Sequence, residues 1–105
     1  MRKLLFALLL TVTTTDAIAE ETRGPVVYSR RCGPLIVINT PQGYVVGVWK
    51  YGVMPPEGDT VVGEWDAYEV RRAYDINTDG GGDMQVVGFG LSRSRAMQVM
   101  KSRCR

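Results

Sequence analysis

The residues best placed to do chemistry form a short acidic stretch, residues 75–83, with the sequence Asp-Ile-Asn-Thr-Asp-Gly-Gly-Gly-Asp. A glycine at its sixth position matches the turn glycine of a calcium-binding EF-hand loop. Alternate oxygen side chains converge on one hard cation when such a glycine lets the chain turn. Four residues match the first, third, fifth and ninth loop positions: Asp75, Asn77, Asp79 and Asp83. The stretch therefore raises calcium as one hypothesis.

The match lacks the strongest ligand of such a loop. Val86 stands at the twelfth position, where the loop needs a bidentate glutamate, and Gly82 stands at the eighth, where a β-branched apolar residue is usual. The flanking segments resemble strands rather than helices. Asp, Asn and Gly in this order also form an ordinary hairpin loop. We therefore prefer the turn, with a calcium-stabilised structural protein as an alternative, and we expect no other cofactor.

The sequence offers few residues of the types and spacings that enzymes use for catalysis. The chain contains no histidine, so the commonest general base is absent. Its serines show no nucleophile-elbow or triad spacing. Glu64 and Asp66 form a carboxylate pair of the kind that glycosidases use, but they fall on an open strand without an evident cleft. We predict that the protein is not an enzyme.

Two segments are candidates for contact with a partner. Residues 52–58 form a loop containing Met54, Pro55 and Pro56, and prolines reduce the entropy lost when a loop docks, so this loop suits an inhibitor of a secreted enzyme. Arg93 and Arg95 begin a basic helix face, whose partner would be an acidic protein or an anionic component of the cell envelope. A solvated helix face is the simpler interpretation of those charges.

Aromatic residues concentrate in the central part of the chain. Exposed rings on small barrels can stack sugars or bases, but a short chain also needs large rings to fill its core. We favour core packing for most of this set, which comprises Tyr44, Trp49, Tyr51, Trp65, Tyr68 and Tyr74.

The N-terminus has the pattern of an export signal. Positive residues precede an apolar run over residues 4–10, and Ala17 and Ala19 occupy the positions that signal peptidase reads. The run is too short to span a bilayer, which needs about 20 residues. We expect residues 1–19 to be removed after Ala19 and the mature protein to be periplasmic or secreted, not membrane-spanning.

The mature chain would hold 86 of the 105 residues, with 11 basic and 10 acidic side chains. Because its net charge is near neutral, no nucleic-acid partner is indicated. A domain this small often needs a covalent link. Cys32 and Cys104 are the only cysteines, and in an oxidising compartment they are expected to pair.

Short apolar runs separated by Gly and Pro predict consecutive strands. Residues 20–31 are polar and are expected to be a flexible mature N-terminus, with at most a short strand over 26–28. Glycines within the predicted strands, such as Gly47 and Gly63, indicate bulges and bends. Ser92 is a good N-cap for a closing helix over 93–104. We expect five strands, at residues 35–40, 44–51, 59–65, 68–76 and 84–91.

These elements predict one disulfide-linked domain over residues 32–105. Its fold class is mainly β, or α+β by strict count. We expect five antiparallel strands in a strongly curled sheet or an SH3-like or OB-like barrel, with one C-terminal helix.

Several short motifs carry a family resemblance. They are Cys-Gly-Pro-Leu-Ile-Val-Ile from Cys32, Gln42-Gly43-Tyr44, Gly58-Asp59 with Gly63, and Leu91-Ser92 before a helix that ends at Cys104. With them the chain resembles small, uncharacterised exported proteins of Gram-negative bacteria. The resemblance implies a periplasmic domain and transfers no catalytic or binding residue. We expect a non-enzymatic module that binds an unknown protein or envelope component.

Overall fold

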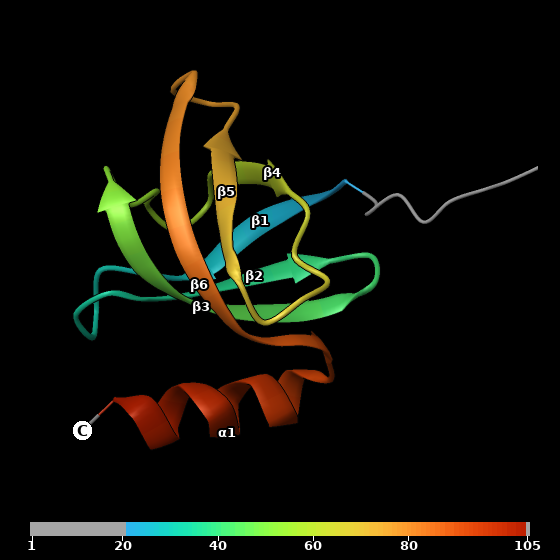
Figure 1. Cartoon of the computed structure of the whole chain (residues 1–105). Coiled ribbons are helices and arrows are strands. Elements are labelled where there is room, and N and C mark those ends of the chain that lie inside the picture. The colour runs from blue at the N-terminus through green and yellow to red at the C-terminus, as the bar shows by residue number, and fades with distance from the viewer. Residues whose placement is uncertain (1–20, 105) are drawn as a thin grey trace, which may run out of the picture.

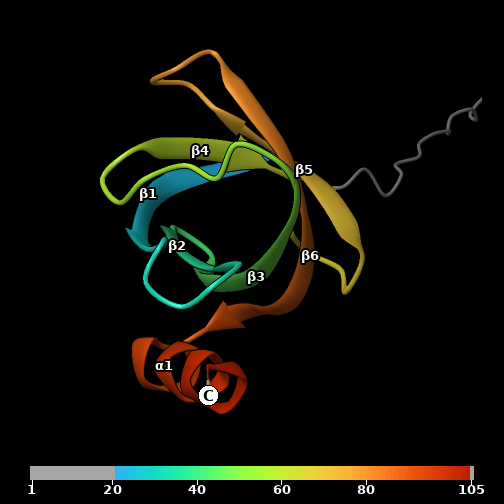
Figure 2. The ribbon, with the colours of Figure 1, turned by 90° about the vertical axis from the view of Figure 1, so that its left-hand side faces the viewer.

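Six antiparallel strands close into a barrel, with one helix against its outer surface, in the computed structural model, which describes residues 21–104 (Figure 1). The strand order is β1-β2-β3-β6-β5-β4, and β4 pairs with β1 to close the ring (Figure 2). The expected class, a mainly β barrel with one C-terminal helix, is confirmed. The strands are β1 (Thr22–Tyr28), β2 (Leu35–Thr40), β3 (Gly43–Gly52), β4 (Thr60–Gly63), β5 (Val70–Asp75) and β6 (Gly80–Leu91).

The strand beyond the five expected is β1, which lies in the segment 20–31 that we expected to be a flexible N-terminus with at most a short strand over 26–28. It pairs with β2 on one side and β4 on the other, so the barrel is closed through it. Its buried residues are Gly24, Val26 and Ser29 just beyond it. Val26 is the one large apolar side chain among them, so the sequence gives only a weak indication of a strand here. Pairing on both sides stabilises the strand, and one of the partners, β4, is distant in sequence.

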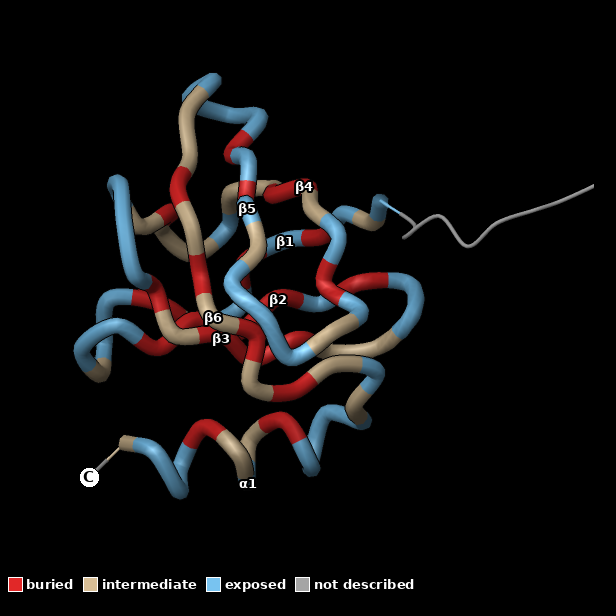
Figure 3. The backbone as a smooth tube through the Cα atoms, viewed as in Figure 1, coloured by how far each residue is buried: buried red, intermediate tan, exposed pale blue. Residues whose placement is uncertain are grey.

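The barrel has two apolar cores that share β2. Ile36 and Ile38 point into the barrel interior, which Trp49, Trp65 and other large side chains fill. Leu35 and Val37 point outward and pack beneath the helix. Both faces of this all-apolar run are therefore covered, and Figure 3 shows the buried tube through β2 and β3.

Helix α1 (Arg93–Arg103) covers the outer core. Ser92 is its N-cap, as predicted, because the side-chain oxygen accepts a hydrogen bond from the backbone N–H of Arg95. Ala96 and Met100 are buried against the sheet. Within residues 21–104, no helix is long and apolar enough to cross a membrane.

The disulfide between Cys32 and Cys104 is formed, as predicted. It joins the end of α1 to the connection between β1 and β2, so the helix is tied to the barrel at its C-terminus. The predicted signal peptide, residues 1–19, lies outside the described residues.

The two strands near the acidic stretch differ from expectation. Residues 80–83, which we expected in the hairpin loop, belong to β6 and pair with β5. In β5 the apolar row that includes Val70 and Tyr74 faces outward, and the interior receives Ala73 and Asp75. The pairing of β5 with β4 and β6 sets this register, and buried Asp75 accepts a hydrogen bond from the backbone N–H of Asn77. The register of β3 shifts beside Gly47, where a bulge was predicted.

Candidate functional site

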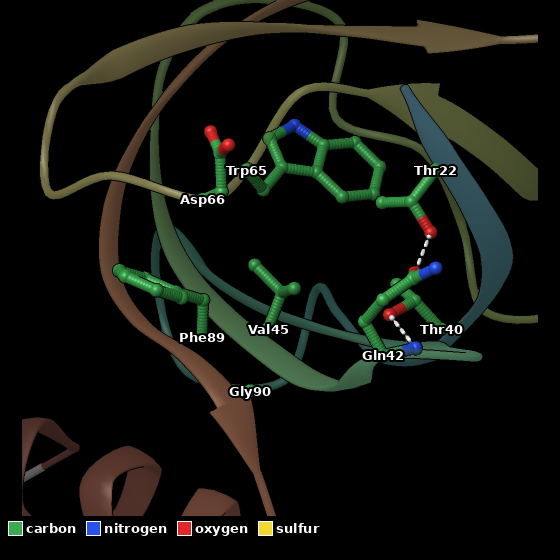
Figure 4. A pocket seen from close by; sticks show the side chains of 8 residues that line it. All are labelled: Thr22, Thr40, Gln42, Val45, Trp65, Asp66, Phe89 and Gly90. Carbon is green, nitrogen blue, oxygen red and sulfur yellow. Dashed lines mark hydrogen bonds between the residues drawn. The ribbon is translucent and has the colours of Figure 1, made fainter. Parts of the chain in front are cut away.

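One end of the barrel is open and forms a cavity, which we call the mouth (Figure 4). It lies where β1 starts, where β2 turns into β3, where β6 ends and where the chain leaves β4. Its volume is about 170 Å³. Mouths of β-barrels are common ligand sites. The lining residues are Thr22, Thr40, Gln42, Val45, Trp65, Asp66, Phe89 and Gly90.

The indole of Trp65 is fixed in the mouth. Its side chain is 2% exposed, and its ring N–H donates a hydrogen bond to the carbonyl of Arg72 at 3.2 Å. A Cβ atom at Gly63 would lie 2.4 Å from two atoms of the ring. The glycine therefore allows the indole to lie against β4. Val45 and Phe89 complete the apolar part of the mouth.

The rim of the mouth is polar, and hydrogen bonds between its own residues fix its shape. The hydroxyl of Thr22 donates to the amide oxygen of Gln42 at 2.5 Å. The hydroxyl of Thr40 donates to the carbonyl of Gly43 and accepts from the backbone N–H of Gln42. Among the described residues that line the mouth, Asp66 alone is charged, and it is exposed.

The mouth is suited to one apolar group. An apolar cavity of about 150 Å³ holds a benzene molecule, so this cavity has room for one ring or one branched aliphatic side chain. The apolar floor would bury that group, and the hydroxyl and amide groups of the rim can hydrogen-bond whatever carries it.

The opposite end of the barrel is closed by residues 52–58. Met54 packs against the inner core and Pro55 is buried. The Ser29 hydroxyl donates to the Pro55 carbonyl at 2.8 Å, and the Arg30 guanidinium donates to the Met54 carbonyl at 2.7 Å.

The expectation that Met54, Pro55 and Pro56 form an outward contact is therefore wrong for Met54 and Pro55. Apolar side chains plug the barrel end, where burial is favourable, and Pro56 is half-buried. The exposed apolar residues here are Tyr51 and Val53, at 73% and 76%.

An ion pair holds the same loop in place. The Arg31 guanidinium contacts Glu57 with both ends of its fork, at 2.5 and 2.8 Å. The backbone N–H of Ser29 also donates to Glu57. The hydrogen bond from Arg31, followed by the one from Ser29, holds the pKa of the Glu57 carboxyl below its ordinary value.

The four residues of the calcium hypothesis are engaged in contacts within the hairpin and with neighbouring strands. Asp75 is buried and accepts from the backbone N–H of Asn77, whose amide oxygen accepts from the N–H of Thr60 at 2.8 Å. Asp79 accepts from the Tyr74 hydroxyl. Asp83 lies 3.8 Å from Arg72.

These contacts fix the hairpin between β5 and β6, and they do not bring the four oxygens together. Across residues 21–104, no group of three or more Asp, Glu, His or Cys side chains could hold a metal ion.

Asp59 and Asp75 form a carboxyl pair at the closed end. A hydrogen bond shared with Asp75, together with burial, raises the pKa of the Asp59 carboxyl, and the charge of Arg30 opposes this weakly. A raised pKa in the folded state means that stability is full below the unfolded pKa and is lost as pH rises through the folded one.

We therefore expect Asp59→Asn to raise the melting temperature at pH 7, because an amide stays neutral beside Asp75. The gain over the native protein should shrink as pH falls through the raised pKa of Asp59, because Asp59 itself then becomes protonated. Thermal unfolding of both proteins between pH 7 and pH 4 measures this difference. A gain that is constant with pH, or a loss at pH 7, would contradict the assignment.

The basic residues of α1 lie on its solvent side. Arg93 and Arg95 are exposed, as are Lys101 and Arg103. In the described part of the chain the ion pairs involve Arg31, Arg71 and Arg72 instead. The structure does not join Glu64 and Asp66: Glu64 faces Arg71 at 3.8 Å, and Asp66 lies at the mouth.

The mouth was not found from the sequence. Trp65 was interpreted as a core residue, and Thr22, Gln42 and Phe89 were not proposed as site residues. They come from different strand ends, and only the closure of the barrel brings them together. Searches of family models, curated proteins and solved structures return no match to this chain.

Proposed function

We propose that this protein is a non-enzymatic binding module of an exported compartment, and that its mouth takes one apolar group of a ligand. The observation that supports it most is the open cavity beside Trp65, with an apolar floor and a polar rim. The disulfide is compatible with an oxidising compartment, and the N-terminal pattern predicts export.

The residues at the mouth favour binding over catalysis. Asp66 is the titratable side chain there, and it is exposed to solvent. A general acid or base must lie within hydrogen-bond reach of the reacting group, usually inside a cleft that excludes water. The remaining lining consists of hydroxyl, amide and apolar groups, which hold a ligand but do not activate one.

An inhibitor of a secreted enzyme is the second candidate, and the exposure of the closed end favours it. The loop is held by the Arg31–Glu57 ion pair and by hydrogen bonds from Ser29 and Arg30. Its exposed contact would be Tyr51 and Val53 rather than Met54 and Pro55.

Capped amino acids test the mouth directly. We expect acetyl-phenylalanine amide and acetyl-leucine amide to bind with a dissociation constant of about 1 mM, the affinity expected of so few atoms. Acetyl-alanine amide and acetyl-glutamate amide should bind at least about tenfold more weakly, because they bury little apolar area. Shifts of backbone amide signals in NMR spectra give both the affinities and the residues affected.

Two variants fill the mouth from different sides. Val45→Phe occupies the floor, and Thr22→Tyr covers the rim without entering the inner core; both should abolish binding of the phenylalanine probe. Val53→Phe, at the closed end, is the control and should bind as the native protein does. Val45→Phe costs about 1–3 kcal/mol through overpacking, so its folding is checked by thermal unfolding. Undiminished binding by the folded Val45→Phe and Thr22→Tyr proteins would contradict the proposal.

A further inference from the structure

Strand β6 is longer than its neighbour β5. Pairing between them ends where Val70 lies opposite Gln85, followed by a hydrogen bond from the Val86 N–H to the Glu69 carbonyl at 3.0 Å. On its other side β6 stays paired with β3 as far as Leu91. Residues 87–91 therefore have a strand on one side, and within residues 21–104 no strand lies on the other. We call these residues the free edge.

The free edge separates two hollows of different chemistry. Phe89 and Gly90 line the apolar mouth, which lies inside the barrel. On the outside, next to the C-terminal end of α1, is a second hollow, which we call the outer groove. Its charged residues, Lys50 and Arg103, are both cationic, and neither makes an ion pair with a described residue. The outer groove is lined by Val48, Lys50, Tyr68, Gln85, Val86, Val87 and Arg103.

We propose that an extended segment of a partner polypeptide pairs with the free edge, places an apolar side chain in the mouth and places an acidic neighbour over Lys50 and Arg103. Successive side chains of a strand point to opposite faces, so one added strand reaches both hollows. Unpaired backbone groups at a strand edge are a recurring site of peptide addition. This inference rests on the proposed function of the mouth and names the class of its ligand.

Tyr68 lies across the path of the added strand. It is 67% exposed, and its ring centre is 4.9 Å from that of Phe89. Binding moves this ring aside, which breaks the contact between the two rings. Tyr68→Ala removes that cost, so it should tighten binding by about 2- to 10-fold, the range that an aromatic pair spans.

Charge favours a different chain over a second copy of this one. Two copies paired through the same edge would bring a second Lys50 and Arg103 close to the first pair, and like charges at short range repel. An acidic segment would neutralise them. The partner is therefore an extended segment that carries both an apolar and an acidic residue.

The test uses the peptide acetyl-Thr-Val-Phe-Asp-Val-Thr-amide and three relatives. In one the Asp is replaced by Lys, in another the backbone amides that face the free edge are N-methylated, and the third is acetyl-phenylalanine amide alone. We expect the Phe-Asp peptide to slow hydrogen exchange in residues 87–91 and to bind more tightly than the single amino acid. N-methylation should weaken it about tenfold, by removing two hydrogen bonds.

A charge reversal gives the matched control. Lys50→Glu should weaken the Phe-Asp peptide and strengthen the Phe-Lys peptide, each by about 2- to 5-fold, as exposed ion pairs do. Lys101→Glu, outside the outer groove, should leave both affinities unchanged.

Different results separate the two proposals. If acetyl-phenylalanine amide binds the mouth but no peptide protects residues 87–91, the inference is overturned and the proposed function stands. If the single amino acid does not bind at all, the proposed function itself fails. Protection of residues 87–91 that grows with protein concentration, without peptide, would identify a second copy as the occupant and overturn the inference.

Discussion

Replacing both cysteines with serine, as Cys32→Ser with Cys104→Ser, is expected to lower the free energy of unfolding by about 2–5 kcal/mol. The bridge closes a loop of 72 residues, and without it the unfolded chain gains freedom. For a domain of this size the loss corresponds to a fall in melting temperature of roughly 10–30 °C. Thermal unfolding followed by circular dichroism measures it.

Removing the disulfide should destabilise the helix before the barrel. Ala96 and Met100 remain to hold α1 against the sheet, but its C-terminal end is no longer tied to the connection between β1 and β2. Hydrogen exchange should therefore accelerate in α1 more than in β3. The control is the native protein treated with a reductant, which should match the double variant. A melting temperature within about 2 °C of the native one would contradict the structural role given to the bridge.

Gly24→Ala is expected to be the most damaging single change in β1. An added Cβ would lie 1.7 Å from the carbonyl oxygen of Asn39 and 2.7 Å from its carbonyl carbon. Both are backbone atoms of β2, so no side-chain rotation relieves the overlap. The two strands must separate, at a cost of about 3 kcal/mol or more, where β1 closes the barrel.

Gly80→Ala is the matched control for Gly24→Ala. The nearest atom to its added Cβ is the Thr78 hydroxyl oxygen at 3.5 Å, which is ordinary contact. Denaturant unfolding of both variants should show a large loss for Gly24→Ala and a change within about 1 kcal/mol for Gly80→Ala. Equal effects would contradict the close approach of β1 and β2.

The parts of the fold that sequence predicts are those with a local signal. The run from Leu35 to Ile38 is apolar at every position and is covered on both faces, and Ser92 begins the helix. The disulfide was expected because the chain has two cysteines and an N-terminal pattern that predicts export. Only residues 26–28 of β1 were expected as a strand, because its first half is held by pairing with β4, which is distant in sequence.

The same reason explains the errors at the candidate sites. The prolines in residues 52–58 suggested a loop that is exposed to a partner. Instead, Met54 and Pro55 cover the apolar interior at the closed end of the barrel. The spacing of the acidic residues raised calcium as an alternative to the preferred turn, and the hydrogen bonds of Asp75, Asn77 and Asp79 fit the turn. The mouth depends on four separate strand ends, and no pattern within one segment marks it.

The proposed function depends on where an apolar group binds, and intermolecular nuclear Overhauser effects from the ring of bound acetyl-phenylalanine amide locate it directly. We predict contacts from the ring protons to the methyl groups of Val45 and to the indole of Trp65, both of which line the mouth. Contacts confined to Tyr51 and Val53, at the closed end, would place binding elsewhere and contradict the mouth as the functional site.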